Sequence, residues 1–548
     1  DPETLGGYYL TEEQGARLAV FPISRRLRYL VPFSDPGESV RYLATREGAG
    51  AVTLVDDGEK FGVWPGTHAL CYKERWLPRF FEALAAAQGL AVTTFSRYLD
   101  GAPATGRAYL PTASYTEMGE WSLPAAAALD LEETAERLRA LPDGERLVRL
   151  LRGGFWRGFL VKYPEVGDAY WRMLHLSRRV RDALAARPGD PALIEARERL
   201  WQGQANDAYW HGVFGGCYLP HLRRAARSAL AGAEARLVAA GALSARMTEE
   251  GDLDGDGQVE VRVRSAELAV TVEPAAGGTL TELVFFPAGV DLADVLARRR
   301  EVYHRQLRKR DAPGQRTDGV RSIHDAPEAK EAGLAARVAE DAFRRASLLD
   351  GLFPPGPAPL DALHPWPAAR VALGALRMRH AVAETTTHTE VRLALEPAGD
   401  VPLAVDKQVS IAHVGAGVIA RYRLRWSGAE TLRARWAVQL NLALTAGDAP
   451  GRFYRLPGQP SLGSCGRREA ARDLAMVDEW LGAEVDVGWS RPGDLGWAPV
   501  ETVSLSEAGF ERIYQGSAIL VAWPIELVPG ADWEVELSLV CRRRAPSM

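Results

Sequence analysis

The spacing of apolar residues changes twice along this 548-residue chain, and each change limits what the chain can fold into. Over roughly the first hundred residues, β-branched or aromatic runs alternate with helical stretches. Between residues 131 and 237 apolar residues recur every three or four positions, as on one face of a helix, and beyond residue 245 they recur every two, as in strands. A chain of this length exceeds one hydrophobic core, so we predict several domains.

The first segment, residues 1–125, is predicted to combine strands and helices. Three runs predict strands: RLAVFPI (17–23), GAVTLV (50–55) and AVTTF (91–95). Residues 36–48 and 75–90 predict the helices between them. Such alternation is typical of a parallel sheet or barrel whose function lies at the carboxyl ends of the strands. Because a full barrel has about eight units, this segment is expected to be the C-terminal part of one.

The other two segments predict a helical domain at 126–244 and a β domain at 245–548. Helical spacing covers four stretches, residues 131–141, 167–186, 190–204 and 218–241. Many alternating runs joined by Gly/Pro turns predict a large antiparallel β-sandwich. Residues 305–328 and 353–367 are expected to be long loops within it. The expected fold class is multidomain, α/β followed by α and then β.

The overall composition argues against several classes of partner. The net charge is −5 with no long basic block, so we expect no nucleic acid. Apolar stretches stay well short of the roughly 18 residues that span a membrane. The four cysteines are scattered without C-x-x-C spacing, which argues against disulfides or structural zinc and favours a cytoplasmic location.

Residues 52–68, VTLVDDGEKFGVWPGTH, hold the densest group of chemical side chains. The predicted strand delivers Asp56, Asp57 and Glu59 at its carboxyl end, and an extended backbone would place Asp57 and Glu59 on one side. Crowded carboxylates raise at least one pKa and prepare a general acid. Trp64 adds a flat apolar surface suited to a sugar ring. A polar turn after a strand is the alternative.

Residues 204–224, QANDAYWHGVFGGCYLPHLRR, form a second group. Asp207 lies three and four positions before Trp210 and His211, which would place them on one helical face. A carboxylate can accept hydrogen bonds from sugar hydroxyls while an indole stacks on the ring. A helix cap with core aromatics is the alternative.

The sequence DLDGDGQVE at residues 252–260 suggests a metal loop. Asp252, Asp254, Asp256 and Glu260 occupy positions 1, 3, 5 and 9 with glycine at position 6, a pattern that suits Ca²⁺. The acid of an EF-hand at position 12 is replaced by Val263. A plain Asp-Gly β-turn is the alternative.

The two motifs at 52–68 and 204–224 together resemble the fourth and fifth motifs of glycoside hydrolase family 57. Residues 109–124, YLPTASYTEMGEWSLP, resemble the branch of that family with 4-α-glucanotransferases, as do SLSEAGFERIYQG and ILVAWPIELV near the end. The resemblance implies a retaining mechanism on a (β/α)7 barrel, with a helical domain and a β-sandwich.

The resemblance also implies roles for individual residues. Asp57 matches the general acid/base, and Glu59, Trp64, Asp207, Trp210 and His211 match positions that line the sugar subsites. The family's nucleophilic Glu, in a Trp-Leu-Thr-Glu-Arg-type motif, has no counterpart here, so the nucleophile segment is expected to be missing.

The function predicted from the resemblance is 4-α-glucanotransferase activity on α-1,4-glucans such as maltooligosaccharides and amylose. The alternatives are an α-amylase on the same scaffold, or an inactive glucan-binding fragment or half of a split enzyme. The expected partners are a glucan substrate and acceptor, with a homodimer as a further expectation. No cofactor is expected beyond a structural Ca²⁺.

Overall fold

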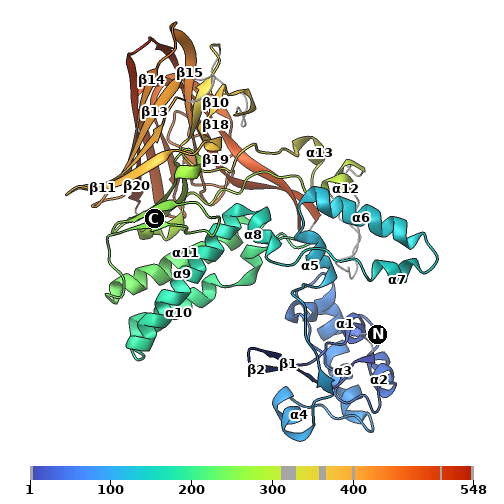
Figure 1. Ribbon diagram of the computed structural model, residues 1–548. Helices are drawn as coiled ribbons and strands as arrows, with labels where there is room; N and C mark the ends of the chain where they lie inside the picture. The colour runs from blue at the N-terminus through green and yellow to red at the C-terminus, as the bar shows by residue number, and fades with distance from the viewer. Residues whose placement is uncertain (1–3, 310–328, 357–365, 398–401, 507–508, 545–548) are drawn as a thin grey trace. The chain divides into compact units, whose positions relative to one another are not determined.

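The computed structural model describes residues 4–309, 329–356, 366–397, 402–506 and 509–544. These residues form two compact units, the first ending at Ala113 and the second beginning at Ser114 (Figure 1). The predicted boundaries at residues 125 and 244 both fall inside the second unit, which holds helices and sheets together.

The first unit contains a small three-stranded sheet and four short helices. Strand β1 pairs antiparallel with β2 and parallel with β3. The helix starts follow ordinary capping rules, since Ser24 caps α1 and Asp35 caps α2 directly before Pro36. The elements are β1 (Tyr9–Glu13), β2 (Ala16–Val20), α1 (Arg25–Leu30), α2 (Pro36–Ala44), α3 (Trp76–Ala86), α4 (Phe95–Gly101) and β3 (Gly106–Arg107).

Two predicted strands of this unit are absent, whereas both predicted helices are confirmed as α2 and α3. In GAVTLV only Thr53 pairs, through a single parallel bridge with Ile23. A further backbone hydrogen bond of this run joins Gly7 N to Ala51 O at 2.8 Å. Gly7 and Ile23 belong to different segments, so no continuous ladder forms. In AVTTF, Thr94 accepts a hydrogen bond from Arg97 N and caps α4, because a threonine side chain competes with strand pairing.

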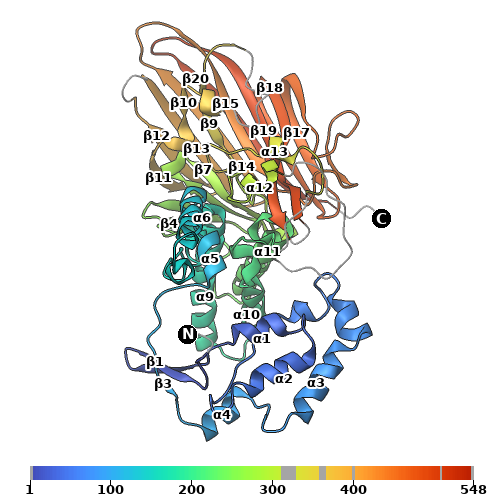
Figure 2. The ribbon, with the colours of Figure 1, turned by 90° about the vertical axis from the view of Figure 1, so that its right-hand side faces the viewer.

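Helices open the second unit, and four of them confirm the helical stretches predicted from spacing. Helices α9, α10 and α11 pack side by side in both views (Figure 2). The helices are α5 (Thr116–Trp121), α6 (Ala125–Arg139), α7 (Gly144–Val148), α8 (Gly158–Lys162), α9 (Pro164–Ala186), α10 (Pro191–Gly203), α11 (Pro220–Ala239), α12 (His304–Lys309) and α13 (Leu334–Arg337). Helix α12 corrects part of the loop predicted at 305–328; residues 310–328 and 357–365 of the predicted loops lie outside the described residues.

Two antiparallel sheets follow, as the two-residue period predicted. The smaller has the order β4-β5-β6-β7-β8, and the larger runs β10-β9-β15-β19-β18-β20-β14-β13-β12-β11 with β16 and β17 attached to β18 through β17. The smaller sheet consists of β4 (Met247–Gly251), β5 (Glu260–Arg264), β6 (Leu268–Glu273), β7 (Thr279–Phe285) and β8 (Val290–Asp291).

The larger sheet contains the longest strands of the described chain. Strands β18 and β19 form a long hairpin, interrupted by a register shift between Val500 and Glu501. The strands are β9 (Leu349–Phe353), β10 (Val371–Ala372), β11 (Arg379–Glu384), β12 (His388–Leu395), β13 (Leu403–Ala412), β14 (Gly417–Trp426), β15 (Leu432–Leu442), β16 (Arg452–Tyr454), β17 (Gly466–Asp478), β18 (Ala483–Ser506), β19 (Gly509–Leu527) and β20 (Asp532–Arg543).

The smaller sheet is covered on both faces. Alternate residues such as Val261, Val270 and Leu283 face the larger sheet and share its hydrophobic core with Trp436. The opposite face packs against α11, where Ala231 contacts residues of β6 and β7. The second unit therefore has three layers: helices, the smaller sheet and the larger sheet (Figure 1).

Charged side chains fill the layer between the helices and the smaller sheet. Glu234 of α11 is buried and lies within 3.1 Å of three arginines. Their guanidinium nitrogens approach at 2.5 Å from Arg172, 3.0 Å from Arg262 and 3.1 Å from Arg264. Although burial alone would raise it, the pKa of Glu234 is lowered, because Arg172 and Arg262 surround the carboxylate.

This network predicts acid-sensitive stability. A carboxylate whose folded pKa lies below its ordinary value of 4.5 stabilises the fold at higher pH and loses that contribution as pH falls. We expect the free energy of unfolding, measured by urea denaturation, to decrease between about pH 5 and pH 2. Glu234→Gln should flatten this part of the profile, whereas Glu195→Gln, which removes an exposed ion pair with Arg236, should leave it unchanged. Identical profiles for both variants would contradict the assignment.

Candidate active site

The candidate sugar-site residues divide between the two units. Asp57, Glu59 and Trp64 belong to the first, and Asp207, Trp210 and His211 belong to the second. Each trio is therefore described within its own unit.

Asp57 stands at the start of a short 3-10 helix, Gly58–Phe61, with its side chain half exposed. Arg28 of α1 donates from Nη2 to Asp57 Oδ2 at 3.0 Å and from Nε to Asp56 Oδ1 at 3.3 Å. Asp56 is buried and also pairs with Lys60 Nζ at 2.8 Å. Arg28 and Lys60 thus fix the Asp56 carboxylate in the interior. The Asp57 carboxylate stays accessible while Arg28 holds it.

The predicted crowding of three carboxylates is corrected by this geometry. Asp56 turns inward to Lys60, whereas Asp57 and Glu59 are exposed. Because Gly58–Phe61 is helical and not extended, residues two apart no longer share a side. The three carboxylates therefore point in different directions. Mutual repulsion does not distinguish Asp57 from the other two.

Trp64 shares the cation Lys60 with Asp56. Its indole stacks on Phe33, with ring centroids 6.1 Å apart and an interplanar angle of 20°, and Lys60 Nζ lies 5.7 Å from its centre. Its backbone N–H donates to Glu59 O at 3.1 Å, which fixes the turn. The half-buried ring retains exposed surface for an apolar ligand face.

The three- and four-residue spacing predicted that the second trio shares one helical face, and this prediction is wrong. The 3-10 helix Asn206–Tyr209 ends before Trp210, which has extended backbone angles of −152° and 173°. Asp207 is exposed, Trp210 is half-buried and His211 is 2 % exposed. Helical spacing fails here because the turn terminates after four residues.

Trp210 pairs with an aromatic residue that sequence reasoning did not single out. Trp121 of α5 stacks on it with centroids 5.9 Å apart and an interplanar angle of 11°. Trp210 Nε1 is buried and has no hydrogen-bond partner within the described chain. Gly212 approaches the Trp121 ring closely, since a Cβ there would lie 2.4 Å from it. Sequence motifs gave no signal for this pairing beyond the presence of Trp121 in the quoted stretch 109–124.

His211 belongs to a buried polar network. Its Nδ1 lies 2.9 Å from Gly215 O and its Nε2 lies 2.9 Å from the Tyr303 hydroxyl. Burial lowers the pKa of His211 to about 4, although the nearby Glu301 opposes the shift. The imidazole is therefore neutral near pH 7, and its contacts serve to position the turn at residues 210–218.

Glu301 is the charged centre of this network and was missed by the sequence analysis. Tyr163 and Tyr218 donate to its Oε1 at 2.6 and 2.9 Å, and Lys162 Nζ lies 2.7 Å from Oε2. Burial alone would raise its pKa, but Lys162 keeps the pKa of Glu301 below its ordinary value. Its partners come from positions more than 80 residues away, so no local motif could reveal it.

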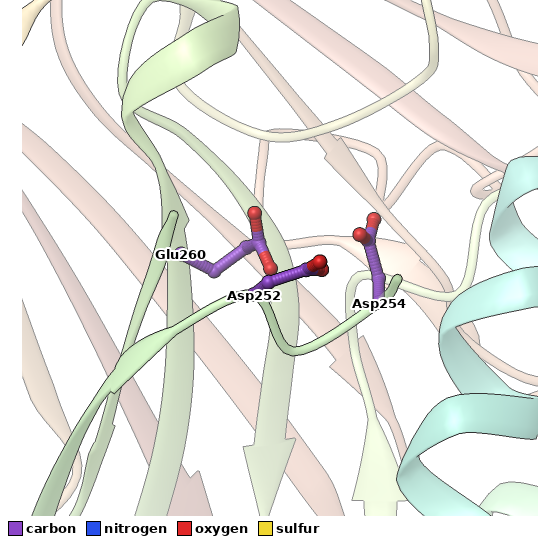
Figure 3. Close-up of side chains that lie close together, drawn as sticks. All are labelled: Asp252, Asp254 and Glu260. Atoms are coloured by element: carbon purple, nitrogen blue, oxygen red, sulfur yellow. The ribbon is translucent and has the colours of Figure 1, made fainter. Parts of the chain in front are cut away.

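The predicted metal loop brings three of its four acidic residues together. Asp252, Asp254 and Glu260 each place one carboxylate oxygen within 4.8 Å of the others (Figure 3). Asp256 is outside this group, and its Oδ1 accepts a hydrogen bond from Gln258 N at 2.7 Å. No other group of three potential metal ligands occurs in the part of the chain that the structure describes.

Three segments of the chain match known protein families. Residues 3–111 match glycosyl hydrolase family 57, and residues 154–237 match the middle domain of α-amylase/4-α-glucanotransferase. Residues 252–537 match the C-terminal domain described under the same name.

Individual relatives are similar over nearly the whole chain. It is 34% identical to α-amylase 1 of Dictyoglomus thermophilum, over 98% of this chain and 76% of the relative. It is also 34% identical to a 4-α-glucanotransferase of Thermococcus kodakarensis, over 94% of this chain and 73% of the relative. The crystal structure of 4-α-glucanotransferase from Thermococcus litoralis matches with a TM-score of 0.76 and 30% identity, covering 99% of this chain and 75% of that one.

The fold and these matches define a carbohydrate-active enzyme of the glycoside hydrolase class. The chain belongs to glycoside hydrolase family 57. The resemblance noted from the two motifs is thereby confirmed. In the described residues, no helix combines the length and apolarity needed to cross a membrane.

Proposed function

We propose that this protein is a 4-α-glucanotransferase that rearranges α-1,4-glucans by a retaining mechanism. The observation that carries the proposal is the accessible Asp57 carboxylate, which lies in the family motif beside Trp64 and is held by Arg28. The names of two relatives, 4-α-glucanotransferases from Thermococcus kodakarensis and Thermococcus litoralis, support the transferase reading.

The proposed reaction follows from the chemistry of retaining enzymes. Asp57 donates a proton to the glycosidic oxygen while a second carboxylate attacks the anomeric carbon, which forms a glycosyl-enzyme and releases one glucan. Asp57 then takes the proton from the 4-hydroxyl of an acceptor glucan as that oxygen attacks the same carbon. The attacking carboxylate is not assigned, because the expected motif does not occur in these 548 residues.

The other candidate residues are proposed to bind sugar rings within each unit. In the first unit, Trp64 offers a flat apolar surface and Glu59 is an exposed acceptor for hydroxyl groups. In the second unit, the stacked Trp121 and Trp210 offer flat apolar surfaces, Asp207 is an exposed acceptor, and the buried His211 supports the turn that carries Trp210. The first unit is proposed to be part of a (β/α)7 barrel and the two sheets a β-sandwich; a cytoplasmic location and a homodimer stay predictions.

The test is incubation of this chain with maltopentaose, with the products separated by length. Transferase activity gives oligomers both longer and shorter than the substrate. Shorter products alone, with an equivalent rise in reducing ends, would overturn the transferase proposal. Unchanged maltopentaose that still binds would support the third reading, a glucan-binding fragment or half of a split enzyme.

The second candidate function is an α-amylase, favoured by the relative from Dictyoglomus thermophilum and by the α-amylase of Pyrococcus abyssi, which is also 34% identical. Both functions use the same glycosyl-enzyme, and they differ in whether water or a glucan resolves it. The ratio of new reducing ends to rearranged chains measures that difference directly.

Trp64 provides a prediction about glucan binding. Trp64→Ala should weaken maltopentaose binding by about 1–2 kcal/mol, because the ring supplies apolar contact area to a sugar face. Isothermal titration would measure the change. The matched control is Trp480→Ala, at a site 71% exposed in the β domain, which should leave the affinity unaltered. An equal loss in both variants would contradict the placement of a sugar at Trp64.

A further inference from the structure

A cavity lined by many charged side chains lies between the smaller sheet and the helical layer, next to the loop that joins β4 to β5. Its lining includes Asp254, Glu260 and Glu273 on the sheet side and Asp168 on α9. Figure 3 shows the carboxylates of Asp252, Asp254 and Glu260 close together on this loop. One oxygen of each lies within 4.8 Å of the others.

Two buried carboxylates at this cavity have an oxygen with no partner. Glu260 is 2% exposed and Glu273 is 8% exposed. Among the described residues, neither Glu260 Oε1 nor Glu273 Oε1 finds a hydrogen-bond partner, and the same holds for the amide oxygen of Gln258 on the loop. A buried unpaired oxygen is costly, so the two carboxylate oxygens of Glu260 and Glu273 at one cavity indicate a missing electrophilic partner.

The basic side chains at the cavity do not complete the cluster. The arginines that line it are paired with other carboxylates: Arg172 and Arg262 with Glu234, and Arg227 with Asp291. Among the described residues, no ion pair joins a basic side chain to Asp252, Asp254, Glu260 or Glu273.

Hydrogen bonds within the loop do not complete these groups. Asp252 accepts from Gly255 N at 2.7 Å and from Gly257 N at 3.1 Å, and Asp254 Oδ1 accepts from Asp256 N at 3.1 Å. Glu260 uses only Oε2, which accepts from Leu253 N at 2.6 Å. These bonds shape the loop so that the remaining oxygens converge, and they leave Glu260 Oε1 and Glu273 Oε1 unused.

We propose that Asp252, Asp254 and Glu260 bind a calcium ion at this cavity, with Glu273 as a further acidic group facing it. Calcium takes six to eight oxygen ligands at about 2.3–2.6 Å, so oxygens on opposite sides of the ion lie about 5 Å apart. The separation of up to 4.8 Å in the cluster fits that span. The irregular arrangement of the loop carboxylates suits calcium better than magnesium, which requires near-octahedral geometry.

The ion would join two layers of the fold. Gly255, at the centre of the loop, has a φ of +80° and lies against Trp171 of α9, because a Cβ there would be 2.3 Å from Trp171 Cζ2. The loop enters β5 directly at Glu260. Calcium therefore fixes the contact between the helices and the smaller sheet, and its role is structural.

The contact with Trp171 supplies the experiment. The chain, freed of metal by chelation, is titrated with Tb³⁺ as a calcium analogue while tryptophan is excited. We expect terbium emission that Ca²⁺ displaces, and a higher melting temperature with Ca²⁺ than with chelator. Trp171→Phe should lose most of the emission but keep Ca²⁺ binding by isothermal titration.

Variants of the ligands separate this site from others. Glu260→Gln and Asp254→Asn should each weaken Ca²⁺ binding at least about tenfold, since even outer-shell changes cost that much. Glu273→Gln should also weaken Ca²⁺ binding, because it removes a carboxylate that faces the ion. Glu250→Gln, on the exposed part of β4, is the control and should change neither.

Three results would overturn the proposal: no Ca²⁺ binding, binding that persists in the Asp254→Asn/Glu260→Gln double variant, or binding of Mg²⁺ alone. Circular dichroism of each variant without metal shows whether it folds. Glucan turnover is not needed for any of these measurements, so the calcium site and the proposed function can fail independently.

Discussion

Asp57→Asn is expected to lower the rate of maltopentaose transfer by roughly 10²- to 10⁴-fold, the usual contribution of a general acid/base. The amide cannot protonate the leaving oxygen or accept a proton from the acceptor. Folding should be unaffected, because the side chain is half exposed and an amide oxygen can still accept the hydrogen bond from Arg28. The measurement is made on a preparation that rearranges maltopentaose.

A substrate with a better leaving group isolates the role of Asp57. Fluoride leaves without a proton, so the first step with α-maltosyl fluoride should be much less impaired in Asp57→Asn. Azide needs no base and should restore turnover, giving a glycosyl azide with retained configuration. Equal losses on fluoride and maltopentaose, without rescue by azide, would show that Asp57 does not act on the proton.

The neighbouring aspartate is the matched control. Asp56→Asn removes a buried charge that pairs with Lys60 at 2.8 Å and should lower the melting temperature. Its activity loss should be the same for both substrates, since it acts through the position of the turn. Asp57→Asn should show the opposite pattern, with a large substrate dependence and little change in melting temperature.

Lys407→Met is expected to lower the free energy of unfolding of the second unit by about 3–5 kcal/mol, the usual cost of breaking a buried ion pair. Lys407 of β13 and Asp350 of β9 are fully buried, with Nζ 2.8 Å from Oδ2. The ammonium also donates to Gly277 O and Leu348 O, each at 2.9 Å. The substitution leaves Asp350 charged and buried without its cation.

A second substitution tests this explanation. Burial lowers the pKa of Lys407 and raises that of Asp350, so each charge is costly without the other. Lys407→Met/Asp350→Leu should recover most of the loss, because an apolar pair can replace a buried ion pair. Urea denaturation measures both variants, and a double variant no more stable than the single one would contradict the prediction.

A surface pair in the same sheet serves as the control. Arg421 of β14 and Glu536 of β20 lie 2.7 Å apart with side chains 51% and 40% exposed. Arg421→Met should change the free energy of unfolding by less than about 1 kcal/mol. A similar cost at both sites would mean that burial does not determine the effect.

The long periodic segments were predictable because the spacing of their apolar residues and the conformational preference of those residues favour the same secondary structure. Helices α9, α10 and α11 lie where the spacing predicted them, and strands such as β12, β14 and β20 lie in the segment whose two-residue period predicted strands. The runs at 50–55 and 91–95 failed, since a β-branched run becomes a strand only with a continuous partner. Thr53 has a single bridge, and Thr94 is used as a helix cap.

The candidate site was predictable where one short motif contains it. Asp57, with its Trp64 neighbour, needed only local sequence, although the helical turn at Gly58–Phe61 separated the carboxylates that an extended chain would have aligned. Glu301 and Glu273 could not be found, because their surroundings come from remote segments. Spacing identifies which residues are close in the chain, and burial depends on how the layers pack.

The charged layer between the helices and the smaller sheet has a consequence for how this molecule tolerates partial unfolding. If α9–α11 detach, the face they uncover carries Arg262, Glu273 and Glu282 where a typical packed interface would carry leucine or valine. Water hydrates this charged face when the helices detach, so other chains bind to it only weakly. Loss of the helical layer should therefore leave a dispersed, refoldable intermediate, because the aggregation-prone apolar surface stays sealed between the two sheets.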